Sequence, residues 1–579
     1  MLVLCLILIT FTNTINYKQK YIHSVFVKRI TIISLVISII LDFNILYFQS
    51  IGNGISLYND LFQITVITII IEIILLFIGL SILFGWPSYI SYGYGTHLVD
   101  KEDYYSLIAI FSILGGSFLI SSLDLLSMYL SIELQSFALY ILATLNKDNL
   151  SSTSAGLKYF LLGSLSSCFI LLGAAIIYSF TGLTHFEAIK TLISIFFLDI
   201  SDYVPHYVIS SDLNPIFHEI NINDSLLVLT KPLFLGFIII LIGFLFKLSA
   251  APFYQWAPDV YDSTPTIVTV WLTIVAKLTI FIFIQGFIDF FYPVSVLNFF
   301  TSIELISPDY PESFINSMIK EYTNINFHNP QYIIKNLLLF SSLLSLLIGT
   351  IAGLSQVKIK RLLAFSSVSH VGFLLLALGI NTQKSIDSFL FYLIQYSFTS
   401  LNIFLIILAI GYLYYNHHTL STYSIPIEIR DRFKSKNIEI DLSYLAELKG
   451  LLFNNPILSF SLAICLFSMA GIPPLIGFFS KQFVLFSSIE NGNYFLSIVA
   501  ILVSVISASY YLKIIKIIFF EEEDNYIITS LEKYLVSLDL SYIHSFIISL
   551  LTFILLLFFM NPSLILNGTL LISLLIFSF

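Results

Sequence analysis

The stretch GFLFKLSAAPFYQWAPDVYDSTPT, residues 243–266, contains the feature that decides how this chain folds. It places Lys247 at the end of an apolar run, and small residues and prolines follow directly. Proline removes a backbone donor and breaks a helix. The next stretch, VTVWLTIVAKLTIFIFIQGF at 268–287, holds Lys277 in the middle of an apolar run. Lysines inside long apolar runs indicate a membrane protein that keeps charge at membrane depth, where each charge costs roughly 2.5 to 3.5 kcal/mol on insertion scales.

The composition of the whole chain supports a membrane protein. Of its 579 residues, 58% are hydrophobic and 11% are charged, and the mean hydropathy is +0.94. A soluble domain carries about 25% charged residues. The repeated apolar runs are long enough for helices that cross a hydrocarbon core of about 30 Å and too long for barrel strands of about 10 residues. We therefore predict an all-α polytopic membrane protein, because only helices and closed barrels span lipid.

The apolar runs define about fourteen expected spans, separated by polar connections. These spans are 2–14, 26–48, 61–85, 104–120, 123–146, 156–181, 226–249, 263–290, 335–355, 361–380, 386–415, 456–486, 494–518 and 541–560. The first run lacks a basic segment before it and a small-residue cleavage site after it, so we interpret it as a retained helix. The apolar tail 562–579 is either a further span or an interfacial segment.

The basic side chains give an expected orientation. Most of the 26 Lys and Arg residues lie on or beside connections that follow odd-numbered spans. The positive-inside rule assigns those connections to the cytoplasmic or matrix side and the N-terminus to the opposite side. The few that follow even-numbered spans are Lys190, Lys231, Lys320, Lys335 and Lys384. The three that remain lie inside apolar runs, and they are Lys247, Lys277 and Lys481.

A second interrupted run, MAGIPPLIGFFSKQFVL at 469–485, also combines prolines and glycines with a lysine, Lys481. Broken helices at corresponding positions of two halves point to internal repeats around a site near the membrane midplane. We predict two inverted five-helix units at 104–290 and 335–520, each with one broken helix. The remaining segments are N-terminal helices at 1–103, an inter-unit loop at 291–334, and a C-terminal helix and tail at 521–579.

Glu133, in SMYLSIELQSFALYIL at 127–142, is the expected carboxylate partner of Lys247. Desolvation weakens the hold of an amine on its proton, and a nearby carboxylate strengthens it. A pair that opens and closes is therefore a proton site of variable affinity. The alternatives are a static ion pair that fixes helix packing and, for Lys247, a side chain that snorkels to the interface. Lys277 lies too deep to snorkel easily, and Lys481 follows the Pro–Pro break.

His370, in LLAFSSVSHVGFLLLAL at 362–378, is flanked by serines. Imidazole exchanges protons near neutral pH, so His370 suits a relay between lysines, although a hydrogen-bonded core histidine is the competing interpretation. Glu72, in a separate apolar run, belongs either to a neighbouring subunit's path or is neutral and hydrogen-bonded. Polar side chains of the span 386–415 either extend a hydrated axis or bond helices together. They are Tyr392, Gln395, Tyr396 and Asn402.

No stretch of the sequence offers a means of binding a nucleotide or carrying an electron. There is no Walker A motif, no dinucleotide-binding glycine pattern after a strand and no cysteine cluster. The loop histidines have no metal-ligand spacing, so no metal site is predicted. We expect no cofactor in this chain and no nucleic-acid partner. Energy must then come from an ion gradient or from a partner.

Four motifs carry a family resemblance. In chain order they are FKLSAAPFYQWAPDVYDSTPT at 246–266, IVAKLTIF at 274–281, RLLAFSSVSHVGF at 361–373 and AGIPPLIGFFSKQFVL at 470–485. Over roughly residues 100–520 the chain resembles the antiporter-like membrane subunits of respiratory complex I, NADH:ubiquinone oxidoreductase. The resemblance is strongest to the subunit 2 branch, in its mitochondrial fourteen-helix form.

The resemblance implies a core subunit that translocates protons across the mitochondrial inner membrane, with its N-terminus on the intermembrane-space side. NADH-to-ubiquinone electron transfer in other subunits would drive it. NAD, FMN, iron–sulfur clusters and ubiquinone would be bound by partner subunits. Partners would include neighbouring antiporter-like subunits, accessory subunits and membrane lipids. The proton-transfer residues carried over by motif are Glu133, Lys247, Lys277, His370 and Lys481. The alternatives are a subunit of a multisubunit cation/proton antiporter and a structural scaffold with inactive lysines.

Overall fold

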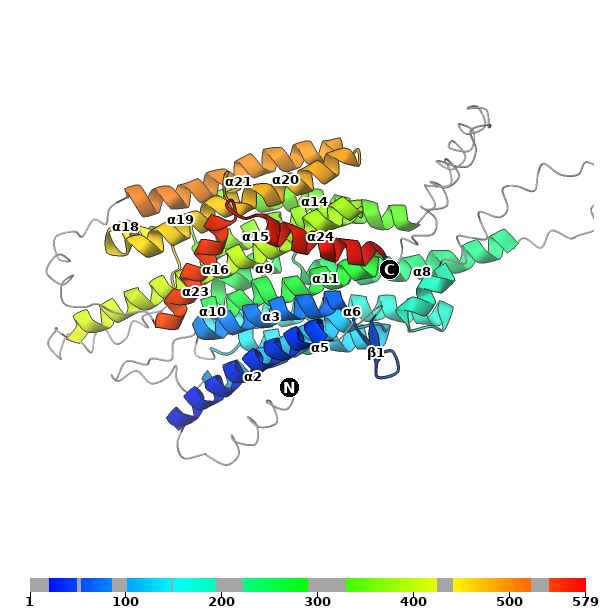
Figure 1. Cartoon of the computed structure of the whole chain (residues 1–579), viewed down its shortest axis with the longest axis horizontal. Helices are drawn as coiled ribbons and strands as arrows, with labels where there is room; N and C mark the ends of the chain where they lie inside the picture. The colour runs from blue at the N-terminus through cyan, green and yellow to red at the C-terminus, as the bar shows by residue number, and fades with distance from the viewer. Residues whose placement is uncertain are drawn as a thin grey trace, which may run out of the picture.

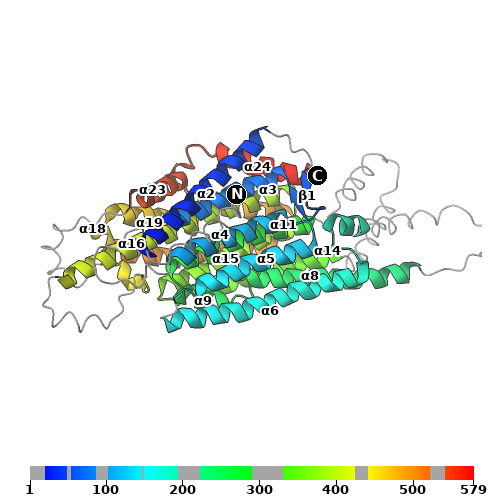
Figure 2. The ribbon, with the colours of Figure 1, turned by 90° about the horizontal axis from the view of Figure 1, so that it is seen from below.

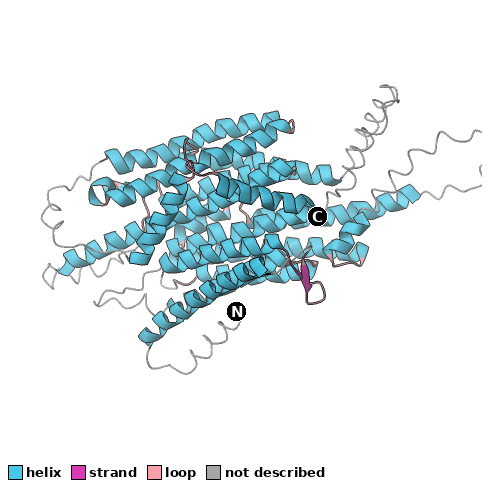
Figure 3. Cartoon of the chain, in the orientation of Figure 1, coloured by secondary structure: helices cyan, strands magenta, loops and turns pink. Residues whose placement is uncertain are grey.

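The fold is a bundle of helices that run alongside one another (Figure 1). It is known from a computed structural model, which describes residues 20–48, 54–85, 102–146, 149–193, 222–289, 330–423, 441–521 and 541–578. Nearly all of these residues are helical (Figure 3). The expected span 2–14 lies outside the described residues. So do the segments 194–221, 291–329 and 424–440, which lie between expected spans.

The described residues form 18 α-helices, which supports the all-α prediction. The first are α2 (Lys20–Phe48), α3 (Val66–Gly85), α4 (Glu102–Ser121), α5 (Leu125–Ala143), α6 (Leu150–Thr181), α8 (Ile222–Lys247), α9 (Trp256–Ser263), α10 (Thr266–Val270) and α11 (Ala276–Asp289). The others are α14 (Pro330–Leu354), α15 (Ile359–Ile380), α16 (Gln383–Tyr423), α18 (Leu451–Asn454), α19 (Pro456–Ala470), α20 (Ile476–Glu490), α21 (Tyr494–Phe520), α23 (Tyr542–Leu557) and α24 (Ser563–Ser578). A π-helical turn, η3 (Trp271–Val275), joins α10 to α11, and a 3-10 turn, η4 (Leu445–Leu448), precedes α18.

Nine helices of the described residues are long and apolar enough to cross a membrane. Shorter apolar helices, such as Pro232–Lys247 and Pro456–Ala470, accompany them. Every expected span from 26–48 to 541–560 contains a helix, and the tail contains α24. The sequence did not predict the small hairpin of β1 (Ile55–Leu57) and β2 (Phe62–Ile64), which leads into α3.

The centre of the bundle is formed by helices that other helices cover completely. The most apolar stretch of 18 residues is 100% buried both within Thr266–Ile288, which contains most of α11, and within α15, whereas in α2 it is 22% buried. In Figure 2, α11 and α15 lie between the side formed by α6 and α8 and the side formed by α2, α23 and α24. A covered helix can hold polar side chains away from lipid, so the core of this bundle is the place for charged residues.

Two transmembrane runs are interrupted. In the first run, α8 ends at Lys247, and the chain resumes helical structure only at Trp256. The expected span 456–486 consists of two helices, α19 and α20, with residues 471–475 between them. In each interruption one residue has a left-handed backbone, Ser249 with φ 59° and Gly471 with φ 83°. The interruptions free backbone groups that require partners inside a membrane protein.

The starts of α5 and α15 are built alike. Leu125 N donates to Thr184 O at 3.0 Å, and Ile359 N donates to Ser443 O at 3.1 Å. The return bonds also correspond, because Phe186 N donates to Leu123 O at 2.9 Å and Leu445 N donates to Val357 O at 3.0 Å. In both cases a segment that follows the next helix along the chain makes one isolated β-bridge to the N-cap residue, Asp124 or Lys358.

The helix in front of each of these two packs against it through a glycine. A Cβ on Gly115 of α4 would lie 2.5 Å from the backbone nitrogen of Gln135, and one on Gly349 of α14 would lie 2.6 Å from that of Ser369. Both positions therefore need glycine for a close helix–helix approach. The pairs α4–α5 and α14–α15 share this contact in the same register, since Gly115 and Gly349 each precede the N-cap residue by nine positions.

Candidate functional site

Glu133 of α5 and Lys247 of α8 face each other inside the bundle. Glu133 Oε1 lies 3.5 Å from Lys247 Nζ, and the side chains are 13% and 8% exposed. Neither atom has a hydrogen-bond partner among the described residues. Lys247 therefore does not snorkel to the interface. The pair is loose, because a hydrogen-bonded ion pair would be closer, at about 2.7–2.9 Å.

A small cavity beside Lys247 has four hydroxyl-bearing side chains among its walls. Its walls come from α5, α6, α8 and α9, and they are formed by Ser136, Tyr140, Tyr159, Gly163, Ser166, Phe246, Lys247 and Trp256. A buried amine without a hydrogen-bond partner beside several hydroxyls is the setting in which ordered water completes the bonding.

Lys277 is buried in α11, and the contacts that its ammonium makes among the described residues are to neutral groups. Its side chain is 2% exposed. Nζ donates to Ser367 Oγ of α15 at 2.9 Å and lies 5.8 Å from the centroid of the Tyr261 ring. Ser367 in turn donates its own proton to Ala364 O at 2.7 Å. The central ammonium is therefore held by a hydroxyl and a ring face.

A π-helical turn stands directly before Lys277. All five residues of η3, Trp271–Val275, are buried, and the Trp271 indole donates to the Tyr105 hydroxyl of α4. Single π-turns inside α-helices are often found at functional sites. Nothing in the apolar run 268–287 predicted this turn, because the turn does not change the spacing of residue types.

His370 of α15 is bonded at both ring nitrogens. Nδ1 lies 2.7 Å from Tyr392 Oη of α16, and Nε2 lies 3.2 Å from Tyr511 Oη of α21. A neutral imidazole donates at one nitrogen and accepts at the other, so each phenol completes the opposite role. His370 follows Ser367 by three positions, which places both on one face of α15. Tyr511 was not expected from the sequence.

Lys481 of α20 reaches back across the second interruption. Its side chain is 7% exposed, and Nζ donates to Ala470 O, the last residue of α19, at 2.9 Å. The terminal carbonyls of a helix carry a partial negative charge, which stabilises a cation there. Nζ also lies 5.8 Å from the centroid of the Phe373 ring, and that ring stacks on Tyr392. The Phe373 ring therefore lies between Lys481 and Tyr392, the hydrogen-bond partner of His370.

The other polar residues of α16 mainly bond helices together. Gln395 Nε2 donates to Ser468 Oγ of α19 at 3.4 Å, and Asn402 Nδ2 donates to Cys465 Sγ of α19 at 3.1 Å. Tyr396 lies against His370, with ring centroids 5.3 Å apart. Glu72 lies half-buried on α3. Of the α16 residues, Tyr392 alone among those described makes a hydrogen bond to His370.

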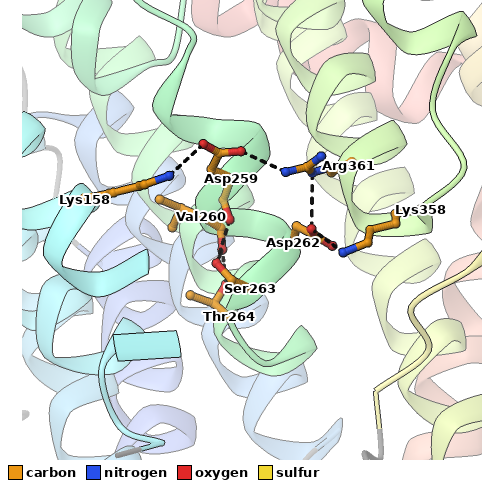
Figure 4. Close-up of polar contacts among 8 residues, drawn as sticks. All are labelled: Lys158, Asp259, Val260, Asp262, Ser263, Thr264, Lys358 and Arg361. Carbon is orange, nitrogen blue, oxygen red and sulfur yellow. Dashed lines mark hydrogen bonds and ion pairs between the residues drawn. The ribbon is translucent and has the colours of Figure 1, made fainter. Parts of the chain in front are cut away.

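Sequence reasoning missed an ion network that holds the short helix α9 (Figure 4). Arg361 of α15 bridges two aspartates of α9, with Nη2 3.0 Å from Asp259 Oδ1 and Nε 3.2 Å from Asp262 Oδ2. Lys158 of α6 pairs with Asp259 at 3.1 Å, and Lys358 pairs with Asp262 at 2.8 Å. The three basic residues of this network were assigned only to connections or their flanks.

The network positions a helix that contacts two of the buried lysines. Helix α9 carries Tyr261, whose ring lies beneath the Lys277 ammonium, and Trp256, which lines the cavity at Lys247. The ion pairs at the surface of α9 therefore connect the positions of both lysines to α6 and α15.

Lys360 is a further buried lysine, at the start of α15. It was assigned to a connection, but it is 4% exposed and donates to Thr264 O and Asp441 Oδ2, both at 2.8 Å. Asp441 also accepts from Thr266 N at 3.1 Å. Thr264 and Thr266 flank the gap between α9 and α10. Lys360 and Asp441 therefore satisfy the backbone groups that this gap frees.

A fold of covered, interrupted helices with lysines at the interruptions defines a class of ion-translocating membrane proteins. The family model described as NADH:quinone oxidoreductase/Mrp antiporter, TM, matches residues 122–308 and 319–507. This chain belongs to that family.

Curated relatives place the chain within the family. NADH-ubiquinone oxidoreductase chain 2 of Rhizopus oryzae is 43% identical and aligns with 96% of each chain. NADH-quinone oxidoreductase subunit N of Pelagibacter ubique is 33% identical over 88% of this chain and 86% of its own length. The chain is therefore one of the antiporter-like membrane subunits of complex I, of the chain 2 and subunit N type.

Solved structures share the fold at low identity. A chain of respiratory complex I from Thermus thermophilus with bound aureothin has a TM-score of 0.63 at 21% identity, covering 98% of this chain and 97% of its own. A chain of the archaeal membrane-bound sulfane sulfur reductase has a TM-score of 0.70 at 16% identity, covering 99% and 96%. A chain of the Mrp complex from Dietzia sp. DQ12-45-1b has a TM-score of 0.68 at 14% identity, covering 100% and 96%.

Proposed function

We propose that Glu133, Lys247, Lys277, His370 and Lys481 form a proton path through this complex I subunit, in the mitochondrial inner membrane. The single observation that carries the proposal is the position of Lys277. It lies in a completely buried span and has a hydroxyl but no described carboxylate as its partner. A static structural lysine in such a place would normally be paired, because an unpaired buried charge is costly.

The path runs through two inverted five-helix units, 104–290 and 335–520, in a fourteen-span chain with its N-terminus on the intermembrane-space side. The matched backbone bonds at the starts of α5 and α15 support the repeat, as do the matched glycine contacts at Gly115 and Gly349. An odd number of spans per unit inverts the second unit. The N-terminal helices at 1–103, the loop 291–334 and the C-terminal helix and tail at 521–579 accompany the units.

Charge moves along this path because each buried amine depends on its neighbours. When Glu133 stays close to Lys247, the ammonium is stabilised by the carboxylate. When the pair opens, the same amine releases its proton more readily. The amine can then turn toward the cavity, whose walls include hydroxyl groups. Protonation of Lys277 would then favour opening of the pair, because two positive charges within one bundle repel. His370 connects Lys277 to Lys481, which exchanges protons with the opposite side or with the next subunit.

The redox chemistry belongs to other subunits of the complex. We infer that NAD, FMN, iron–sulfur clusters and ubiquinone bind to partner subunits, and that neighbouring antiporter-like subunits, accessory subunits and lipids cover the outer helices. Among the described residues of this chain, no group of three or more His, Cys, Asp or Glu residues could hold a metal. The energy of electron transfer would reach this subunit as changes in charge along the axis.

Replacing the central lysine tests the proposal. The complex with Lys277→Met should assemble, retain its flavin, and lose most of its proton pumping and coupled ubiquinone reduction. Lys384→Met is the matched control, because the Lys384 side chain is 69% exposed and pairs with Glu490 at the surface. Proton pumping and coupled turnover are measured in proteoliposomes with NADH and ubiquinone. Unchanged pumping in Lys277→Met would refute the central role.

A further inference from the structure

Ser367 occupies in the second unit the position that Glu133 occupies in the first. The register follows from the backbone: Glu133 comes nine residues after the N-cap Asp124 of α5, and Ser367 comes nine residues after the N-cap Lys358 of α15. The same register aligns the two isolated bridges and the two glycine contacts. These backbone contacts fix the correspondence without any similarity of side chains.

Both positions contact a lysine, but with opposite chemistry. Glu133 offers a carboxylate to Lys247 at 3.5 Å, whereas Ser367 offers a neutral oxygen to Lys277 at 2.9 Å. Each lysine comes from the first unit, so Ser367 joins the second unit to the central lysine of the first. A carboxylate stabilises an ammonium far more than a hydroxyl does. The second unit therefore holds the Lys277 amine of the first unit without trapping the charge.

The hydroxyl of Ser367 holds the amine. It donates to Ala364 O, a backbone carbonyl, at 2.7 Å, and Tyr396 is a further hydrogen-bond partner of this serine. Ser367 Oγ accepts an N–H of Lys277. When Lys277 releases a proton, one N–H bond breaks and the proton goes to water or toward His370, one turn further along the same face of α15.

We propose that Ser367 is a positioning residue for the proton path, the neutral counterpart of Glu133, which holds the Lys277 amine against the face of α15 that also carries His370 and leaves its proton free to move. The proposal rests on the proposed proton translocation. It assigns a role to a residue type that carries no charge and so gives no titration of its own. It also explains why the hydroxyl run before His370 includes a serine at this position.

The test compares variants at position 367 in the assembled complex. Ser367→Ala removes the acceptor, and we expect coupled ubiquinone reduction and proton pumping to fall on the order of tenfold, the usual worth of a hydrogen bond to a charged group. Ser367→Thr keeps a hydroxyl and should restore most of the rate. Ser367→Asp creates a carboxylate beside Lys277, and it should assemble but pump as poorly as Ser367→Ala or worse.

Matched controls come from Ser342 of α14, which is also fully buried and donates to a carbonyl of its own helix, Leu339 O, at 2.6 Å. Ser342→Ala should pump normally. Ser342→Asp should reduce assembly, because its carboxylate would have no lysine partner. Normal pumping by Ser367→Ala, or by Ser367→Asp, would overturn the role of Ser367. That result would leave the proposed function standing if Lys277→Met still fails, so the two failures are distinguishable.

Discussion

The two interruptions of the bundle hold their lysines in different ways. At the end of α8, Lys247 faces the carboxylate of Glu133 at 3.5 Å. Between α19 and α20, Lys481 donates to the end of a helix, the carbonyl of Ala470, at 2.9 Å. A formal charge compensates the first lysine, and a partial charge compensates the second. A broken helix with a lysine can therefore form two sites that differ in their affinity for a proton.

A broken helix is itself a source of charge stabilisation. The gap between α9 and α10 makes the same point, because Lys360 donates to Thr264 O and pairs with Asp441. Freed carbonyls attract lysines, and freed amides attract carboxylates. A lysine near a helix break can therefore have a structural role, as Lys360 does, or belong to the proposed proton path. The neighbours of its amine decide which.

The largest effect is expected at the first interruption. Glu133→Ala leaves the buried Lys247 amine without its carboxylate and should destabilise the subunit by about 3–5 kcal/mol. In the double variant, Glu133→Ala together with Lys247→Met, the unpaired charge is gone, and most of the thermal stability should return. Differential scanning calorimetry of the purified complex measures the thermal stability of both variants. Equal stability of the single and double variants would show that the pair carries no buried charge.

A somewhat smaller effect is expected at Lys360. Lys360→Met deprives Thr264 O and Asp441 of a buried donor, and each buried polar group left without a partner costs about 1–3 kcal/mol. We expect lower assembly and a lower melting temperature. The exposed Lys384→Met serves again as the control. If Lys360→Met and Lys384→Met had the same melting temperature, the capping role assigned to Lys360 would be wrong.

The second interruption should tolerate the loss of its lysine better than the first tolerates the loss of its carboxylate. Lys481→Met removes a hydrogen bond to a helix end and strands no charge, so the cost should be about 1–2 kcal/mol. Assembly should be retained while proton pumping is lost. Native electrophoresis measures assembly, and proteoliposomes measure pumping. Loss of assembly as severe as in Glu133→Ala would remove the distinction between the two interruptions.

The smallest effect on stability is expected in the ion network around α9. Arg361 and Asp259 are 40% and 42% exposed, and exposed ion pairs contribute only about 0.2–1 kcal/mol. Arg361→Gln should therefore change stability little and weaken coupling by displacing Tyr261 and Trp256. The measurement is the number of protons pumped per NADH at matched complex content. A large loss of stability with normal coupling would show a purely structural network.

Sequence reasoning predicted what depends on hydrophobicity and charge. Runs of apolar residues indicated every described transmembrane helix, and the count of basic residues singled out Lys247, Lys277 and Lys481. It assigned Lys360 to a connection because helix ends have no hydrophobic signature. It missed Ser367, Tyr511 and the π-turn η3 because a serine, a tyrosine or an extra residue per turn looks ordinary in an apolar run. Their importance lies in what they contact.

Replacing Lys247, Lys277 and Lys481 together removes all three buried charges of the proposed path. The complex with Lys247→Met, Lys277→Met and Lys481→Met is reconstituted in proteoliposomes, and protons translocated per NADH oxidised are counted. We expect an assembled complex that pumps fewer protons per NADH than the Lys384→Met control. An unchanged proton count in the triple variant would contradict it and identify the subunit as a scaffold with inactive lysines.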